Sequence, residues 1–142
     1  MRPATLAATF VLLAPLAVSA ETFEVKMLNG NATGGMAFEP DFLSLKPGDK
    51  LKFLATQRGH NAATIDGFLP EGAAPFKGKI NEEIEITFTQ EGFYGIKCSP
   101  HYDMGMVMLV RVGDAPLSKM KIADEVPAGA VKRFGSIVER NR

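Results

Sequence analysis

The ten residues Lys97–Met106 contain the only cysteine of this 142-residue chain, one of its two histidines and two of its seven methionines. The donors are Cys98, His101, Met104 and Met106. Thiolate and thioether groups favour Cu(I), and imidazole suits copper in either oxidation state. These donors in one short segment therefore indicate a copper site, which would need a further ligand from elsewhere in the chain.

Alternating apolar and charged residues predict half-buried strands in three parts of the chain. The apolar positions of these strands are Phe23, Val25 and Met27; Leu51, Phe53 and Ala55; and Ile84, Ile86 and Phe88. Glycine, asparagine and proline predict turns between strands at residues 29–31, 34–35, 47–49 and 91–92. Short strands separated by such turns predict an all-β antiparallel sandwich or barrel.

Two segments are expected to lie at the centre of this sandwich. Residues 106–112 are apolar on both faces until Arg111, and residues 93–98 are mostly apolar. In the second segment Tyr94, Ile96 and Cys98 share one face, because side chains of a strand alternate between its two sides. Cys98 is therefore predicted to point inward at a strand end, where a metal ligand would be shielded from water.

The C-terminal residues change to a helical period after a sandwich that ends at about residue 113. A short helix is expected at Leu117–Ala123. A second helix follows Pro127, with Ala130, Val131, Phe134, Ile137 and Val138 as its apolar stripe. The two helices together span about residues 116–140. Packing of the second helix on the sandwich is the favoured interpretation, and a partner-binding helix is the alternative.

Residues 1–20 have the pattern of a secretory signal peptide, with cleavage expected after Ala20. Arg2 gives a positive start, residues 5–18 are almost wholly apolar, and the segment ends in small residues. A membrane anchor is the alternative, but the apolar run is short for the roughly 20 residues that span a bilayer, and Pro15 interrupts it. Residues 21–142 are expected to form a single exported domain.

Removing the leader takes away Arg2 and leaves 15 basic residues against 16 acidic ones. Near neutrality argues against a dedicated nucleic-acid binder. Export also makes a lone thiol unusual, because an oxidising compartment holds most cysteines in disulfides. Cys98 is then an inert buried cysteine, one half of an intermolecular disulfide, a metal ligand or a nucleophile.

The spacing of the donors favours a metal. Cys98 and His101 form a Cys-x-x-His pair, Met106 follows in the same loop, and His60 lies just after the strand that contains Phe53. Two imidazoles, one thiolate and a weak axial methionine are the ligand set of blue-copper electron-transfer sites. A structural zinc site rarely includes a thioether. A hydrolase would need an oxyanion or orienting group beside Cys98, and the sequence offers none there.

The His60-Asn61 pair, the run from Tyr94 to Val107, the strand order and the C-terminal helices together resemble the small blue-copper proteins of the cupredoxin family. Plastocyanins and amicyanins share the Cys-x-Pro-His core but lack such helices. The resemblance implies a cupredoxin-type Greek-key sandwich with two C-terminal α-helices and one copper ion per chain. It implies four copper ligands: His60, Cys98, His101 and Met106. The shorter spacing of amicyanins would select Met104 in place of Met106.

The resemblance also implies residues that support the ligands. Asn61 is expected to join the two ligand-bearing loops by side-chain hydrogen bonds, and its backbone N–H is a candidate donor to the Cys98 sulfur. Pro100 lacks an N–H and cannot donate there. Met36 matches a methionine that lies near an imidazole ligand, with simple core packing as the alternative. The edge of His101 is expected at the surface. The candidates for steering partners are Arg58, Lys77, Lys79 and Lys97.

The resemblance therefore predicts a periplasmic carrier of single electrons that is not an enzyme. It suggests a nitrite reductase of denitrification as acceptor and a cytochrome as possible donor. The protein is expected to be a monomer, to have no nucleic-acid partner and to be free of the membrane once the leader is removed. Copper storage or delivery, which uses similar soft ligands, is the alternative function.

Overall fold

The computed structural model describes residues 12–15 and 19–142. The expected leader lies outside the described residues except for 12–15 and 19–20, so it stays a prediction. Among the described residues, no helix has the length and hydropathy needed to cross a membrane.

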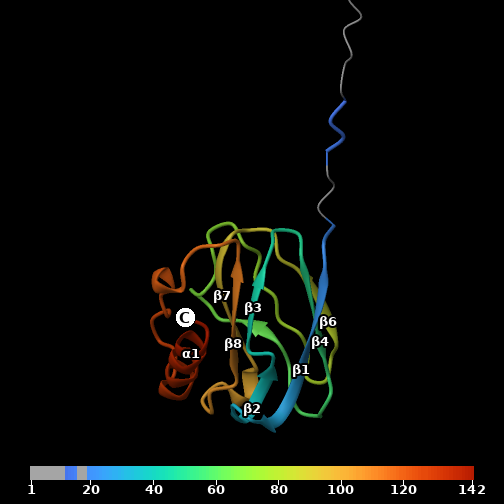
Figure 1. Cartoon of the computed structure of the whole chain (residues 1–142). Helices are drawn as coiled ribbons and strands as arrows, with labels where there is room; N and C mark the ends of the chain where they lie inside the picture. Colours follow the sequence, from blue (N-terminus) through green and yellow to red (C-terminus); the bar gives the residue numbers. More distant parts are fainter. Residues whose placement is uncertain (1–11, 16–18) are drawn as a thin grey trace, which may run out of the picture.

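Two four-stranded sheets face each other (Figure 1). The strands are β1 (Thr22–Asn31), β2 (Gly34–Glu39), β3 (Phe42–Leu45), β4 (Lys50–Leu54), β5 (Ala63–Thr64), β6 (Ile84–Thr87), β7 (Gly92–Lys97) and β8 (Val107–Val112). The 3-10 helix η1 (Ser99–His101) joins β7 to β8, and a second one, η2 (Leu117–Lys119), precedes the α-helix α1 (Ala128–Arg140).

The sheets have the strand orders β2-β1-β4-β6 and β3-β8-β7-β5. Within them β1 pairs with β4, and β3 with β8, in parallel. The expectation of a purely antiparallel sandwich is therefore wrong for these two pairs. Alternation of side chains specifies which face of a strand is buried, but it carries no information about the direction of the neighbouring strand. The chain passes from the first sheet to the second between β2 and β3 and returns between β3 and β4, so neither parallel pair is joined by a hairpin.

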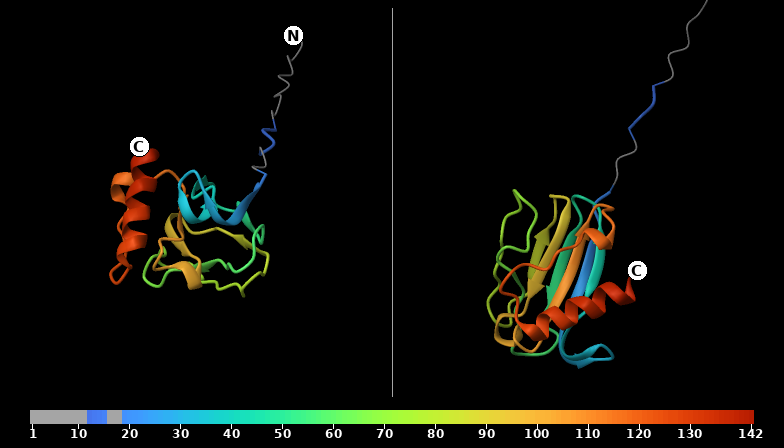
Figure 2. Two further views of the ribbon diagram at one scale, coloured as in Figure 1. Left: turned by 90° about the horizontal axis from the view of Figure 1, so that it is seen from below. Right: turned by 90° about the vertical axis from the view of Figure 1, so that its left-hand side faces the viewer.

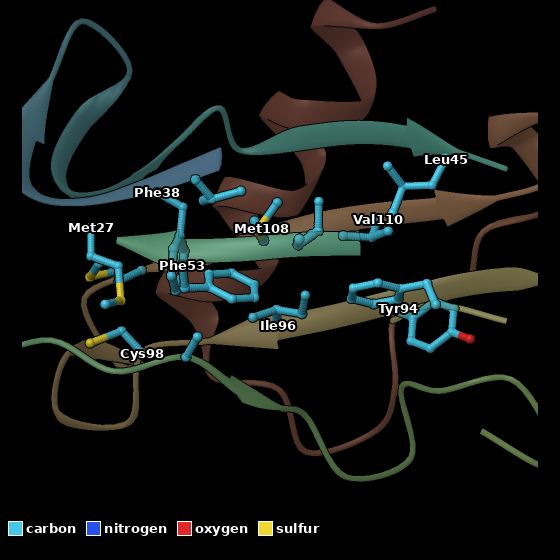
Figure 3. Packing of buried hydrophobic residues seen from close by; sticks show 14 of the residues in the cluster. Met27, Phe38, Leu45, Phe53, Tyr94, Ile96, Cys98, Met108 and Val110 are labelled. Atoms are coloured by element: carbon cyan, nitrogen blue, oxygen red, sulfur yellow. The ribbon is translucent and has the colours of Figure 1, made fainter. Parts of the chain in front are cut away.

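The core between the sheets contains the predicted apolar positions. Val25 and Met27 of β1 and Leu51 and Phe53 of β4 are fully buried in one cluster. Figure 3 shows Cys98 at the same end of this cluster as Met27. The inward direction predicted for Cys98 is thus confirmed, and the sulfur lies where the core meets the η1 loop.

Strand β8 is buried on both faces, as its sequence predicts. Met108 and Val110 face the other sheet, whereas Val107 and Leu109 belong to a second cluster. In that cluster they pack with residues of α1, namely Ala130, Phe134 and Ile137. Figure 2 shows the helix lying against one side of the sandwich, which confirms the packed interpretation. Val131, expected in the stripe, is instead 40% exposed.

Of the two expected C-terminal helices only the second is an α-helix. The first is a single 3-10 turn, η2, followed by extended and turn residues up to Pro127. Pro116 precedes η2 and offers no side-chain cap. Fewer than about 12 residues make a marginal helix without strong capping. The apolar residues Leu117, Met120 and Ile122 still pack, half-buried, against the second cluster.

Candidate metal centre

Three donor atoms from two loops converge at one end of the sandwich. The Nδ1 atoms of His60 and His101 are 3.1 Å apart, and the Cys98 Sγ lies 3.6 Å from the first and 3.4 Å from the second. His60 and Cys98 are 1% and 0% exposed, and His101 is half-buried. Among the described residues these three form the one group of histidine, cysteine and acidic side chains that could hold a metal ion.

The separations suit ligands of a single ion. Bonds of about 2.0–2.3 Å to nitrogen and sulfur at angles of roughly 100–120° place neighbouring donors about 3.1–3.8 Å apart. All three observed distances fall in this interval. Two imidazoles and one thiol on one side of an ion match the trigonal part of a blue-copper ligand set.

Backbone hydrogen bonds fix the loop that carries two of the donors. The Cys98 N–H donates to the Met106 carbonyl at 3.0 Å, and the Met106 N–H donates to the His101 carbonyl at 3.1 Å. Pro100 lies in the first turn of η1, where a missing N–H breaks no bond. Gly105 has a φ of +88°, a conformation that side-chain-bearing residues rarely adopt. The loop therefore returns to Met106 directly beside Cys98.

His60 is oriented by Asn29, a residue that sequence reasoning missed. The Nε2 atom of His60 lies 2.8 Å from Asn29 Oδ1, which can only accept, so Nε2 carries the proton. The lone pair of the neutral ring is then on Nδ1, which faces Cys98 and His101. Residues 29–31 were expected to form a turn, but β1 continues through them to Asn31. No sequence pattern identifies Asn29 as a partner of His60.

Asn61 joins the two ligand loops, as expected, and is 2% exposed. Its Oδ1 accepts from the Ser99 N–H at 2.6 Å, and its Nδ2 donates to Ser99 Oγ at 3.1 Å and to the Gly78 carbonyl at 3.0 Å. Because Asn61 follows His60 and Ser99 follows Cys98, these bonds hold one donor relative to the other.

The two methionines of the ligand loop differ in burial. Met106 is 0% exposed and packs in the cluster that contains Cys98, whereas Met104 is 58% exposed. A thioether can approach a buried ion only if the side chain is itself inside. The burial therefore favours Met106 over Met104 as the fourth donor.

Comparison with known proteins agrees with this donor set. Residues 25–113 match the family described as copper binding proteins, plastocyanin/azurin family. The chain belongs to this copper-binding family. It is 50% identical over 114 residues to pseudoazurin of Paracoccus pantotrophus, covering 79% of each chain. It is also 50% identical over 111 residues to pseudoazurin of Methylorubrum extorquens, covering 78% of this chain and 74% of that one.

A solved structure extends the match to the fold. The crystal structure of pseudoazurin from Methylobacterium extorquens AM1 has a TM-score of 0.74 and 41% sequence identity to this chain, covering 85% of this chain and 99% of that one. The predicted cupredoxin sandwich is thus confirmed. Copper is the cofactor of this family member, with one site per chain, and the protein is a copper electron-transfer protein.

The protonation of this cupredoxin's donors depends on burial. Burial raises the pKa of the Cys98 thiol, and the backbone N–H groups of Asn61 and His101 oppose this shift by hydrogen bonding. The pKa of His60 is lowered, mainly by burial and further by the charge of His101. Both shifts favour the uncharged forms. Without metal, Cys98 and His60 are therefore neutral at pH 7, and the thiol must release its proton when a cation binds.

The remaining predicted residues differ in burial. Met36 is half-buried against the core cluster of Cys98 and Met106, and Pro100 is exposed. Arg58, Lys77 and Lys79 are exposed.

The predicted lysines share surface depressions. Lys77 and Lys79 line one depression with Asn61 and Ser99, and Lys77 lines a second one with Lys97. Lys97 is half-buried, with its Nζ 4.9 Å from the centre of the Tyr102 ring. These three lysines of the cupredoxin therefore occupy neighbouring positions beside the ligand loop.

Proposed function

We propose that His60 Nδ1, Cys98 Sγ and His101 Nδ1 hold one copper ion, with Met106 as the weak axial ligand. The observation that carries this proposal is the convergence of the three donor atoms at spacings that suit one ion. When bound, copper supplies a one-electron couple between Cu(I) and Cu(II).

The residues of the chain keep the ligand set rigid. Asn29 fixes the ring of His60, and the three side-chain hydrogen bonds of Asn61 hold the two loops together. The fully buried Cys98 and Met106 are shielded from water. A site with little freedom to rearrange favours rapid electron exchange, because the donors need not move between the two oxidation states.

His101 is the route by which electrons enter and leave in this proposal. It is the only one of the three clustered donors that is not fully buried. Its neighbours Pro100 and Met104 are exposed and present an apolar surface. A redox partner that docks there would approach the donor set without passing through the core.

The physiological role follows from similarity to pseudoazurin. We propose a periplasmic carrier that donates to a nitrite reductase and receives electrons from a cytochrome, and that acts as a monomer without catalysing a reaction itself. We further propose a leader at residues 1–20 and one domain at residues 21–142. Sequencing the N-terminus of the periplasmic protein tests cleavage after Ala20. Burial of Cys98 and His60 disfavours copper delivery, which needs exchangeable donors.

Leucine at Met106 is expected to change the copper spectrum, whereas leucine at Met104 is expected to leave it unaltered. Met106 is buried with Cys98, and Met104 extends into solvent. Leucine preserves the volume but removes the thioether, so only loss of a true ligand alters the environment of the thiolate. Absorption and electron paramagnetic resonance spectra of both copper-loaded variants provide the measurement. A spectrum altered by Met104→Leu alone would make Met104 the axial ligand.

Charge reversal at Lys77 and Lys97 is expected to slow association with a nitrite reductase about 10-fold or more at low salt, and less at high salt. These lysines lie beside the ligand loop and would attract an acidic partner. The matched control is the double variant K119E/K121E, which makes the same change of charge at exposed residues beyond the opposite end of β8. Equal rates for the two double variants would rule out steering by this patch.

A further inference from the structure

The first turn of α1 lies directly on the ligand loop. A Cβ added at Gly105 would lie 2.7 Å from the carbonyl oxygen of Gly129, and one added at Gly129 would overlap the carbonyl oxygen of Asp103. Two glycines thus allow backbone to contact backbone, which any side chain would prevent. Since Gly105 immediately precedes Met106, the helix supports the segment that places the proposed axial ligand.

Arg133 connects the next turn of the same helix to the β1–β2 hairpin. Its Nη2 donates to the Gly35 carbonyl at 2.8 Å, and its Nη1 donates to the Met36 carbonyl at 3.5 Å. The planar fork of a guanidinium suits two neighbouring acceptors, which a lysine cannot engage in the same way. In the part of the chain that the structure describes, Arg133 has no carboxylate partner, so these carbonyls are the polar groups it engages.

Met36 has a backbone conformation that needs such support. Its φ is +48°, in the left-handed region that residues with a side chain rarely adopt. The side chain packs against the core cluster that contains Cys98 and Met106. A change in the Met36 backbone would therefore move a side chain that packs on the same core cluster as Cys98 and Met106.

We propose that Arg133 is a positioning residue of the copper centre. Its hydrogen bonds hold the Gly35–Met36 peptide units in place, while Gly129 supports the loop before Met106. The helix α1 thereby holds both the ligand loop and the β1–β2 hairpin in place, in addition to covering the sandwich. The inference rests on the ligand set proposed above, because it concerns the surroundings of that set.

The variant Arg133→Met tests this role in the copper-loaded protein. The expected result is a changed ratio of the two thiolate-to-copper absorption bands and a shifted reduction potential. Lys132→Met is the matched control, because it removes the same charge from the exposed neighbouring residue of the helix. Arg133→Lys keeps the positive charge and a hydrogen-bond donor but lacks the planar fork of the guanidinium. Its spectrum is therefore expected between those of the wild type and Arg133→Met.

Unfolding of the metal-free variants separates positioning from stability. If Arg133→Met lowers the unfolding midpoint but keeps the wild-type band ratio and potential, Arg133 is merely structural and the inference is overturned. The same holds if Lys132→Met shifts the potential and the band ratio as much as Arg133→Met does. A wild-type protein that lacks the bands would instead contradict the proposed ligand set.

Discussion

Replacing Cys98 with serine is expected to abolish the intense visible absorption of the copper-loaded protein. That absorption arises from charge transfer between a thiolate and copper, and Cys98 is the only cysteine of the chain. A hydroxyl is also a poor ligand for a soft metal, so the variant is expected to bind copper more weakly. Titration of the metal-free variant with Cu(II), followed by absorption spectroscopy and metal analysis, measures both effects.

A relocated cysteine provides the control for this experiment. The double variant C98S/S118C keeps one thiol but moves it to the exposed residue Ser118, away from His60 and His101. It is expected to lack the stable charge-transfer band as well. The assignment requires a buried thiolate between two imidazoles, so a persistent band in either variant would refute it.

Replacing Asn61 with alanine is expected to destabilise the metal-free protein by about 3 kcal/mol, because three hydrogen bonds are lost and the buried Gly78 carbonyl stays unsatisfied. The lost contacts connect Asn61 to Ser99 and to the Gly78 carbonyl. With the loops no longer joined, copper is also expected to dissociate at least about 10-fold faster, since 1.4 kcal/mol of lost restraint corresponds to that factor.

Asn141→Ala is the matched control for Asn61→Ala. Asn141 donates one side-chain hydrogen bond, to the Ile137 carbonyl at the end of α1, and is exposed. Its loss is expected to cost about 1 kcal/mol or less. Urea unfolding of the metal-free proteins and transfer of copper to a chelator compare the two variants. Equal effects of the two substitutions would mean that Asn61 does not hold the ligand loops together.

The sequence predicts those parts of the molecule in which local pattern and burial coincide. Apolar residues on both faces of β8 predict a strand covered on two sides, and the second cover is α1. Alternation along β7 correctly turns Cys98 inward. The helical stripe identifies Phe134 and Ile137 as buried. In each case the position of a residue in the strand or helix repeat indicates whether its side chain is buried.

The unpredicted parts depend on contacts between distant segments. Asn29 reaches His60 across 31 positions of sequence, and Arg133 reaches Met36 across 97. A single sequence records neither pairing, because any exposed asparagine or arginine has the same local pattern. The parallel pairing of β1 with β4 is of the same kind, since no hairpin joins these two strands. The 3-10 turn η2 shows that scattered apolar residues without a capping side chain need not form an α-helix.

The most direct test of the account is titration of the purified metal-free protein with Cu(II). The His60, Cys98 and His101 donors predict saturation at one copper per chain, with an intense thiolate charge-transfer band that grows in proportion to bound metal. Reduction by one electron is expected to bleach the band, and reoxidation to restore it. Copper that binds without this band would contradict the proposed centre.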